Sequence, residues 1–270
     1  MEFPDSLVLL GCGKMGSAML AGWLDDGLPK SSVFVLEPYP SDWLDGLAAQ
    51  GLHLNESIPE TAEFCVLAVK PQMMGEALPR LAALGNGKTV FLSIAAGTRI
   101  ATLEAILGDR SPIVRAMPNT PAAIRSGITA LVGNSRVSKP AMALADALLR
   151  AVGQTVRLQS EDQMDAVTAV SGSGPAYVFL LVEAMAAAGA AEGLPPDLAM
   201  KLARATVAGA GRLAEMSGED PAQLRKNVTS PGGTTAAALE VLMAERTGLP
   251  ELVRRAVAAA AARSRELGNS

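Results

Sequence analysis

The chain has 270 residues, of which 49% are hydrophobic but only 3% aromatic, and its 23 Lys and Arg and 27 Asp and Glu residues give a net charge of -4. A chain of this length buries enough apolar surface for about two domains that fold in water. The acidic balance and the scattered basic residues argue against a nucleic-acid-binding protein. The single histidine, His53, argues against enzymes that depend on an imidazole base.

The cysteines and the apolar segments indicate the cellular compartment in which the protein is expected. Cys12 and Cys65 have no CxxC partner, so neither a disulfide framework nor a metal site is expected, and a reducing compartment is the simpler interpretation. Residues 1–10 lack the pattern of a signal peptide. The longest apolar stretch, 177–191, contains Glu183 and is too short to span a bilayer, so it is expected to be a buried helix. A cytoplasmic protein with no membrane or nucleic-acid partner is predicted.

Residues 1–160 alternate between short β-branched runs and helix-like segments. This alternation predicts βαβ units on a parallel, doubly wound sheet. The expected strands are 7–10, 32–36, 64–69, 89–94, 113–116, 127–132 and 155–158, and the expected helices are 16–25, 41–50, 100–107 and 139–151.

Residues 161–270 contain no strand pattern and are expected to form an all-α domain. The expected helices are 176–191, 198–215, 235–245 and 251–266, separated by breaks at 172–175, 193–196, 218–221, 230–233 and 248–250. Their apolar residues cover more of the circumference than a one-sided surface helix needs. A subunit interface would explain such helices, so we predict a homo-oligomer.

The first chemical motif is GxGxxG at residues 11–16, between an expected strand and an expected helix. In this context Gly11 permits a tight turn, Gly13 lets the backbone approach a pyrophosphate, and Gly16 lets the helix pack closely on the strand. The phosphates would bind free N–H groups at the helix N-terminus. The alternative is an ordinary strand-to-helix turn without a ligand.

An acidic residue follows the second expected strand. Glu37 lies 21 residues after Gly16, close to the spacing of about 20 for the acid that binds the adenosine ribose. A carboxylate accepts a hydrogen bond from a ribose 2′-hydroxyl and repels a 2′-phosphate, and the loop 38–43 contains no Arg. Glu37 taken alone therefore favours NADH. The alternatives are a solvated glutamate, or a phosphate bound by Ser41 or by a basic side chain from elsewhere.

Two further strand ends are expected at the same cleft. The segments 68–72 and 94–98 close the third and fourth strands with mostly small residues, and ligands of open α/β sheets lie at the carboxyl ends of strands. Ordinary turns are the alternative for both, and Lys70 would bind a phosphate or remain solvated.

Two segments of the helical half are unusual. Residues 169–177 interrupt apolar sequence with small residues, place Pro175 at a first helical position and offer Ser173 or Gly174 as the cap. Residues 230–235, SPGGTT, open a helix with several free N–H groups and three hydroxyls, which suits a small carboxylate. A flexible capped turn is the alternative for the second segment.

Together these segments resemble the pyrroline-5-carboxylate reductase family over essentially the whole chain. The motifs that carry the resemblance are GCGKMG at 11–16, AVKP at 68–71, AAG at 95–97, MPNTP at 117–121, SGSGPAY at 171–177 and NVTSPGGTT at 227–235. The resemblance implies an N-terminal Rossmann domain, residues 1–160, and a helical domain, residues 161–270, that forms an intertwined dimer and often a decamer. It also implies reduction of L-1-pyrroline-5-carboxylate to L-proline, the last step of proline biosynthesis, with NADPH or NADH.

The resemblance also assigns residues, position by position. Those implied for the cofactor are Gly11, Cys12, Gly13, Lys14, Met15, Gly16, Glu37, Asn55, Ala68, Val69, Lys70, Pro71, Ala95, Ala96, Gly97 and Asn227. Those implied for the substrate are Glu161, Ser230, Gly232, Gly233, Thr234 and Thr235. Thr235 is the implied catalytic residue, with its hydroxyl beside the ring nitrogen. Many members of the family have a serine or a basic residue where this chain has Glu37, so the resemblance does not decide for NADPH.

Imine reduction suits a chain with one histidine. The imine nitrogen is protonated near neutral pH, and the iminium carbon then accepts hydride without a proton from a side chain at the same moment. Catalysis then depends mainly on positioning, and His53 is expected to be structural or solvated. Two other functions stay open at this point: another Rossmann imine or hydroxyacid reductase, and a non-catalytic nucleotide-binding protein. A hydroxyacid dehydrogenase would use a lysine in the helix after Gly172, where residues 173–183 contain none.

Overall fold

The structure is a computed structural model that describes residues 3–268. Within these residues the chain forms two compact units. The first runs to Gly172 and also takes in the chain from Ala260 onward, and the second is Ser173–Ala259. Helical structure begins at Glu161, near the change in composition, whereas the compact units divide after Gly172. The domain boundary after residue 160 therefore stays a prediction.

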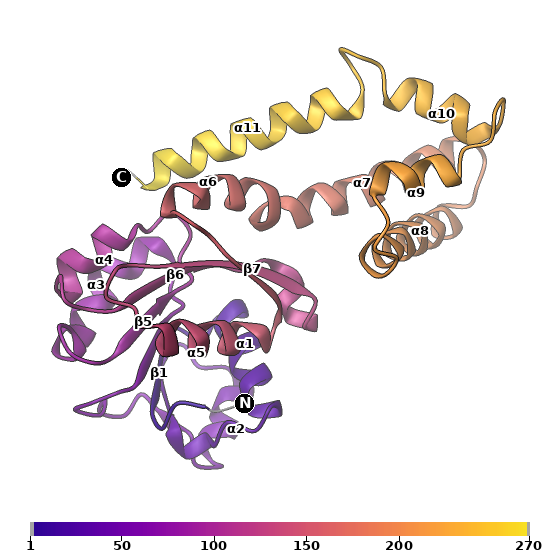
Figure 1. Cartoon of the computed structure of the whole chain (residues 1–270). Helices are drawn as coiled ribbons and strands as arrows, with labels where there is room; N and C mark the ends of the chain where they lie inside the picture. Colours follow the sequence, from indigo (N-terminus) through magenta and orange to yellow (C-terminus); the bar gives the residue numbers. More distant parts are fainter. Residues whose placement is uncertain (1–2, 269–270) are drawn as a thin grey trace. The chain divides into compact units, whose positions relative to one another are not determined.

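A single sheet organises the first unit (Figure 1). Its order is β3-β2-β1-β4-β5-β6-β7-β8 among the described residues. The strands are β1 Leu7–Leu10, β2 Val33–Leu36, β3 His53–Leu54, β4 Phe64–Leu67, β5 Val90–Ser93, β6 Ile113–Met117, β7 Gly127–Gly133 and β8 Gly153–Arg157. All seven expected strands are present, and the two-residue β3 is additional. The predicted α/β class with a Rossmann-like sheet and a helical second part is confirmed.

One expectation about the sheet is wrong, because β7 runs antiparallel to β6. The connection between these strands is a short 3₁₀ turn, η4 Thr120–Ile124, and Arg125 adopts a left-handed φ of 56°. A parallel connection needs a crossover of a dozen or more residues. The nine residues 118–126 are too few, so the chain can only return as a hairpin.

Helical segments cover both faces of the sheet. Helices α1 Lys14–Asp25 and α5 Lys139–Arg150 pack on one face, and α4 Ile100–Leu107 and η3 Leu78–Leu84 pack on the other. The remaining helical segments of this unit are η1 Lys30–Ser32, α2 Asp42–Ala48, η2 Pro71–Met73, α3 Met74–Ala77, η5 Glu161–Gln163, α6 Met164–Val167 and the π-helical η6 Thr168–Gly172. Because the central strands are buried on both faces, their sequences are continuous apolar runs rather than alternating ones.

The core is divided into two layers by the sheet. On the α1 side, Leu7 and Leu9 pack with Trp23, whose indole Nε1 donates to the Leu148 carbonyl at 2.8 Å. On the other side, Val8 and Leu10 belong to the layer that contains the apolar residues of η3 and α4. Successive residues of β1 therefore serve opposite layers, and β1 is fixed between them.

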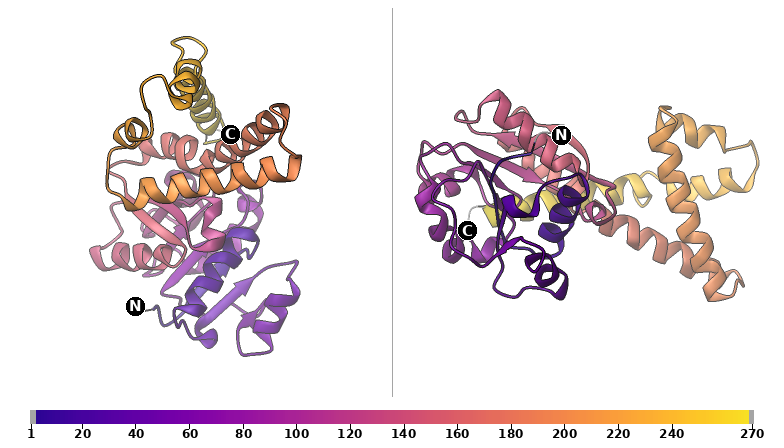
Figure 2. Two further views of the ribbon diagram at one scale, coloured as in Figure 1. Left: turned by 90° about the vertical axis from the view of Figure 1, so that its right-hand side faces the viewer. Right: turned by 90° about the horizontal axis from the view of Figure 1, so that it is seen from below.

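The second unit is helical. Its elements are α7 Gly174–Ala191, α8 Pro196–Met216, α9 Pro221–Asn227, α10 Thr234–Leu242 and the first part of α11 Leu249–Gly268, and α7 packs against α8 (Figure 2). Helix α9 was not expected from the sequence, although Asp220 accepts a hydrogen bond from the Ala222 N–H at 2.8 Å as a side-chain cap. Large apolar side chains stay exposed, among them Phe179 at 59% and Leu180 at 64%.

The start of α7 differs from the expectation. Ser173 occupies the N-cap position, but it has helical angles and its side chain makes no cap hydrogen bond. The predicted break at 172–175 is instead preceded by the π-helical turn, in which the Ser171 hydroxyl donates to the Val167 carbonyl at 3.0 Å. Pro175 is tolerated because a residue in the first turn has no intrahelical acceptor for its N–H.

Helical structure from Glu161 to Ala191 is long and apolar enough to cross a membrane by length and composition. The expectation that 177–191 is too short considered only part of this segment, and the expectation that it is a buried helix is wrong for the single chain, in which most of its residues are exposed. One such helix is weak evidence for a membrane protein, and only 6% of its most apolar window is buried within the chain. A helix that is covered by another subunit has the same composition.

Gly153 provides a test of the β7–β8 pairing. Its φ is +141°, and an added Cβ would lie 2.6 Å from the Gly127 backbone nitrogen, on the strand opposite. Gly153→Ala is therefore expected to lower the free energy of unfolding by about 2–4 kcal/mol. Gly46→Ala is the matched control, because Gly46 lies in α2 with open space around its Cβ position. That change should be neutral or stabilising by up to about 1 kcal/mol. Denaturant unfolding at one protein concentration measures both, and equal midpoints would contradict the prediction.

Candidate functional site

The glycine-rich turn after β1 is shaped by close backbone contacts. Gly11 has a φ of +90°, and an added Cβ would lie 2.8 Å from a Val69 methyl group. At Gly16 an added Cβ would lie 2.5 Å from the Gly11 carbonyl oxygen. Gly13 differs, because no atom lies within 4 Å of its Cβ position. The turn is therefore packed from behind at Gly11 and Gly16 and open in front at Gly13.

Helix α1 begins in this opening. Its N-cap residue is Gly13, which has no side chain to accept a hydrogen bond from the first turn. The first turn also contains no acidic residue. The first N–H groups of α1 are therefore available to a ligand, and the helix dipole favours an anion there. This geometry fits the pyrophosphate of a dinucleotide.

A cleft of about 360 Å³ runs from this turn across the ends of the neighbouring strands. Nine of the residues that line it were expected at the cofactor: Gly13, Lys14, Met15, Ala68, Val69, Lys70, Pro71, Ala95 and Ala96. The other lining residues are Ile94, Met117, Pro118, Asn119, Thr120 and Gly172. Of these, Ile94 belongs to the segment 94–98 that was expected at the cleft, whereas sequence reasoning assigned no role to residues 117–120 or to Gly172. The rule that ligands lie at the carboxyl ends of strands also applies to β6 and would have indicated residues 117–120.

Asn119 holds the far wall of this cleft in place. Its amide Nδ2 donates to the Ser171 carbonyl at 3.1 Å, and its Oδ1 accepts from the Ile128 N–H at 2.9 Å. The loop after β6 is thereby joined both to the π-helical turn and to β7. These two hydrogen bonds fix the orientation of the Asn119 side chain at the cleft.

Glu37 lies beside the glycine-rich turn with its position fixed. Its Oε2 accepts from the Cys12 N–H at 2.7 Å, and its Oε1 accepts from the Tyr39 N–H at 3.1 Å. Its backbone is held by Asn55, whose Oδ1 accepts from the Glu37 N–H at 2.9 Å and whose Nδ2 donates to the Glu37 carbonyl at 2.8 Å. Asn55 adopts a left-handed φ of 55° to make this pair of bonds. Glu37 and Asn55, which were expected at the adenosine ribose, are thus in direct contact.

Glu161 lies in the first unit, in the turn η5. Its Oε1 atom accepts from Arg115 Nη1 at 2.7 Å and from the Ile100 N–H at 2.9 Å. Arg115 is 4% exposed, whereas the Glu161 side chain is 29% exposed, so the ion pair is buried on the Arg115 side and partly open to solvent on the other. No sequence pattern indicated this pairing, because the two charged residues are 46 positions apart.

The loop that was expected to bind the substrate carboxylate lies in the second unit. The N-cap residue of α10 is Gly233, which has no side chain to accept a hydrogen bond. The N–H groups of Thr234 and Thr235 therefore lie at a helix N-terminus without a side-chain cap. Gly232 has a φ of +70°, and the Gly233 N–H donates to the Ser230 carbonyl at 3.1 Å. This compact turn can present several donors to one small anion.

Asn227, at the end of α9, has its side chain engaged locally. Its Oδ1 accepts from Gln223 Nε2 at 2.7 Å, and its Nδ2 donates to Glu219 Oε2 at 3.1 Å. The predicted role of Asn227 at the nicotinamide end stays a prediction.

Comparison with known proteins identifies the family. Residues 161–267 match the family model for pyrroline-5-carboxylate reductase dimerisation, and residues 6–97 match that for coenzyme F420-dependent NADP oxidoreductases. The pyrroline-5-carboxylate reductase of Pseudomonas aeruginosa is 41% identical over 97% of this chain and 96% of its own, and that of Synechocystis is 40% identical over 97% and 98%. The chain belongs to the pyrroline-5-carboxylate reductase family.

Solved pyrroline-5-carboxylate reductases have the same fold. The Coxiella burnetii enzyme matches with a TM-score of 0.90 at 37% identity, covering 98% of this chain and 99% of its own. The Plasmodium falciparum enzyme, solved with NADP bound, matches with a TM-score of 0.84 at 29% identity, covering 98% of both chains. The chain described by the present structure therefore converts L-1-pyrroline-5-carboxylate to L-proline with NAD(P)H, and it forms an oligomer.

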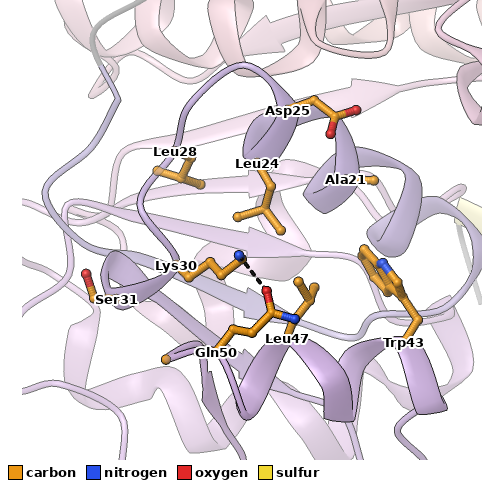
Figure 3. A pocket seen from close by; sticks show the side chains of 10 residues that line it. Ala21, Leu24, Asp25, Leu28, Lys30, Ser31, Trp43, Leu47 and Gln50 are labelled. Atoms are coloured by element: carbon orange, nitrogen blue, oxygen red, sulfur yellow. Dashed lines mark hydrogen bonds between the residues drawn. The ribbon is translucent and has the colours of Figure 1, made fainter.

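A second pocket of this reductase lies away from the cleft (Figure 3). It has a volume of about 600 Å³ and is lined by residues of α1, α2 and the segment between them, and Lys30 Nζ donates to Gln50 Oε1 across it at 2.8 Å. None of the residues expected at the cofactor or the substrate lines this pocket. The end of α1 that borders it is opposite to the end that opens the cleft.

Cys12 allows a test of the charge at this turn. Burial, together with the Glu37 carboxylate, raises the pKa of the Cys12 thiol to about 12. The thiolate is the reactive form, so at pH 8 iodoacetamide should alkylate Cys12 on the order of a thousandfold more slowly than a cysteine of the denatured chain. Glu37→Gln removes the nearby charge and should lower this pKa and speed the reaction, whereas Glu56→Gln should not. Peptide mapping separates Cys12 from the buried Cys65, and equal rates in the folded and denatured protein would contradict the prediction.

Proposed function

We propose that this reductase prefers NADH to NADPH and that it binds the carboxylate of L-1-pyrroline-5-carboxylate with the loop Ser230–Thr234. The observation that supports the first part is the fixed position of Glu37. The observation that supports the second is the uncapped N-terminus of α10. The two features act on different ligands, so each has its own experiment.

The preference for NADH follows from the charge and the anchoring of Glu37. A glutamate in a loop could turn aside to admit a 2′-phosphate, but the Glu37 carboxylate accepts from two backbone N–H groups and its own backbone is held by Asn55. A 2′-phosphate beside it would meet a like charge in a partly buried place. A ribose 2′-hydroxyl would instead donate a hydrogen bond to it.

The cofactor residues have separate tasks. Gly13 and the first turn of α1 hold the pyrophosphate, Glu37 and Asn55 surround the adenosine ribose, and the turns 68–71 and 95–97 line the rest of the path. When bound, NAD(P)H supplies the hydride that the imine carbon accepts. The contribution of the chain is to hold the dinucleotide and the substrate at reacting distance, which can supply several kcal/mol of the barrier reduction.

The substrate residues lie around the start of α10. Ser230 and the N–H groups of Gly232 and Thr234 bind the carboxylate, where the helix dipole adds to the hydrogen bonds. Gly233, whose own N–H donates to the Ser230 carbonyl, shapes the turn around it. The Thr235 hydroxyl forms a hydrogen bond with the ring nitrogen, which orients the imine carbon. Protonation of that nitrogen by water near neutral pH makes the carbon electrophilic, so no side-chain acid has to supply a proton at the same moment.

We also infer the assembly and the compartment. Helices α7 and α8 expose large apolar side chains in the single chain, which supports an intertwined dimer, and dimers of this kind are expected to associate into a decamer. Cys12 and Cys65 are both free thiols, which suits a reducing compartment and supports a cytoplasmic location.

Replacement of Glu37 tests the cofactor preference. Glu37→Ser should raise kcat/KM for NADPH relative to NADH by about tenfold or more, because a repulsion of roughly 1–2 kcal/mol is removed. Steady-state kinetics with both nucleotides measures the ratio, and NADPH titration by fluorescence measures the binding separately.

Two matched variants test whether the NADPH/NADH ratio depends on a charge at position 37 or only on the net charge of the protein. Glu37→Gln keeps the size of the side chain and should shift the ratio in the same direction. Asp109→Asn removes one exposed charge from the loop that leads into the start of β6, whereas Glu37 follows the end of β2. This change should leave the NADPH/NADH ratio unchanged. A wild-type enzyme with higher kcat/KM for NADPH than for NADH would refute the preference.

Thr235 is tested by the loss of its hydroxyl. Thr235→Ala should lower kcat by about tenfold or more, because the hydrogen bond to the ring nitrogen is lost, while the Kd for NADH changes by less than about twofold. Thr235→Ser keeps the hydroxyl and should restore most of the activity. An unchanged kcat in Thr235→Ala would remove this residue from the reaction.

A further inference from the structure

Arg115 places a positive charge inside the first unit, in a strand that borders the cofactor cleft. It lies in β6, whose last residue, Met117, lines the cleft. Only 4% of Arg115 is exposed, and its Nη1 lies 2.7 Å from Glu161 Oε1. A buried charge is costly unless it is paired and hydrogen-bonded. Glu161 supplies that pairing.

The same carboxylate oxygen also caps a helix. Glu161 Oε1 accepts from the N–H of Ile100, the first residue of α4, at 2.9 Å. The residue at the N-cap position of α4 is Arg99, and its side chain makes no cap hydrogen bond. An N-cap Ser or Asp would accept from the second or third N–H of the helix, whereas here the first N–H is bound by a residue 61 positions later in the sequence.

Helix α4 starts immediately after a turn of the cofactor cleft. Ala95 and Ala96 line the cleft, and Gly97 adopts a φ of +77° that few other residues tolerate. Between Gly97 and Ile100 there are only two residues, so a shift of the α4 N-terminus is transmitted to the turn. The bond from Ile100 to Glu161 therefore fixes one end of the wall that the cofactor contacts.

The other side of this turn is held by the end of the chain. The Cβ of Leu267, in α11, lies 3.3 Å from the position that a Gly97 Cβ would take. The same part of α11 is anchored to the first unit where Ser264 Oγ donates to Asp165 Oδ1 at 2.6 Å. The turn is therefore packed against α11 on one side and tied to Glu161 through α4 on the other.

We propose that Glu161 is a positioning residue for cofactor binding: its carboxylate, neutralised by Arg115, holds the N-terminus of α4 and thereby the turn 95–98 against the dinucleotide. This inference rests on the proposed use of the cleft by NADH. It differs from the role that the family resemblance implies, which is contact with the substrate at the edge of its pocket. The two roles predict loss of affinity for different ligands.

Glu161→Gln tests which ligand depends on this side chain. The Kd for NADH, measured by fluorescence titration of the full-length enzyme without substrate, should rise by about five- to tenfold, because the buried Arg115 loses its counter-charge and the bond from the Ile100 N–H loses its charged acceptor. The KM for L-1-pyrroline-5-carboxylate at saturating NADH should stay within about twofold. Asp162→Asn is the matched control, since it removes the neighbouring exposed carboxylate and should leave the Kd for NADH unchanged.

A second pair of variants isolates the single hydrogen bond. Ile100→Pro removes the N–H that Glu161 accepts, and proline suits the first helical position after Arg99, whose ψ of 154° is the conformation that precedes proline. Ile100→Ala loses a similar amount of buried side chain but keeps the N–H. The Kd for NADH should therefore rise by about threefold or more in Ile100→Pro relative to Ile100→Ala.

The outcomes separate this inference from the function on which it rests. If the wild-type enzyme does not bind NADH, the proposed function fails. If it binds NADH and Glu161→Gln raises only the KM for the substrate, Glu161 contacts the substrate and the inference is overturned. If Glu161→Gln lowers the Tm but leaves both constants unchanged, or if the two Ile100 variants have equal affinity for NADH, the pair serves folding alone and the inference is overturned too.

Discussion

The register of the parallel strands determines where the functional parts of the first unit lie. Leu10 of β1 is level with Leu36 of β2 and Leu67 of β4, and Leu67 is level with Ser93 of β5. The residues that follow these strands therefore emerge in one row at one edge of the sheet. Backbone hydrogen bonds hold this row together: the Gly11 N–H donates to the Leu36 carbonyl at 2.9 Å, and the Ala68 N–H donates to the Leu10 carbonyl at 2.8 Å. A cleft at this edge is a consequence of the register, and the identity of the turn residues determines what it binds.

The sequence predicted those parts of the site that depend on local pattern. Glycine spacing after β1 and an acid after β2 are short-range signals, and the structure places Glu37 beside the glycine-rich turn, where its Oε2 accepts from the Cys12 N–H. The parts that it did not predict depend on long-range geometry. The resemblance implied Asn55 and Glu161 as site residues, but not the contacts of Asn55 with the Glu37 backbone or of Glu161 with Arg115, which join segments with no periodic relation. Strand direction was missed at β7 because an apolar run is the same in both directions and only the length of the connection distinguishes them.

In the second unit, the apolar composition indicated a partner subunit, but it did not indicate where a ligand binds. Phe179 and Leu180 leave more than half of their surface exposed within the chain, and α7 belongs to the part that matches the dimerisation family model. An apolar helix of this kind is stable in water when another subunit covers it. The loop before α10 is carried by the same unit. The proposed carboxylate site thus belongs to the part of the chain that assembles, which ties the geometry of the substrate loop to the formation of the oligomer.

The one histidine of the sequence, His53, makes its contacts at the edge of the sheet. His53 stacks on Phe34 with ring centroids 4.3 Å apart, and its Nδ1 lies 2.9 Å from Glu56, so it serves the edge of the sheet at β3. With no imidazole to move a proton, rate acceleration has to come from holding an electrophilic iminium and a hydride donor together. Such catalysis is sensitive to displacements of the backbone turns that form the walls. Asn55 anchors the Glu37 backbone by two hydrogen bonds, and Glu161 anchors the turn 95–98 through the Ile100 N–H. Their positions, at the turns rather than in the core, are those that a mechanism based on placement requires.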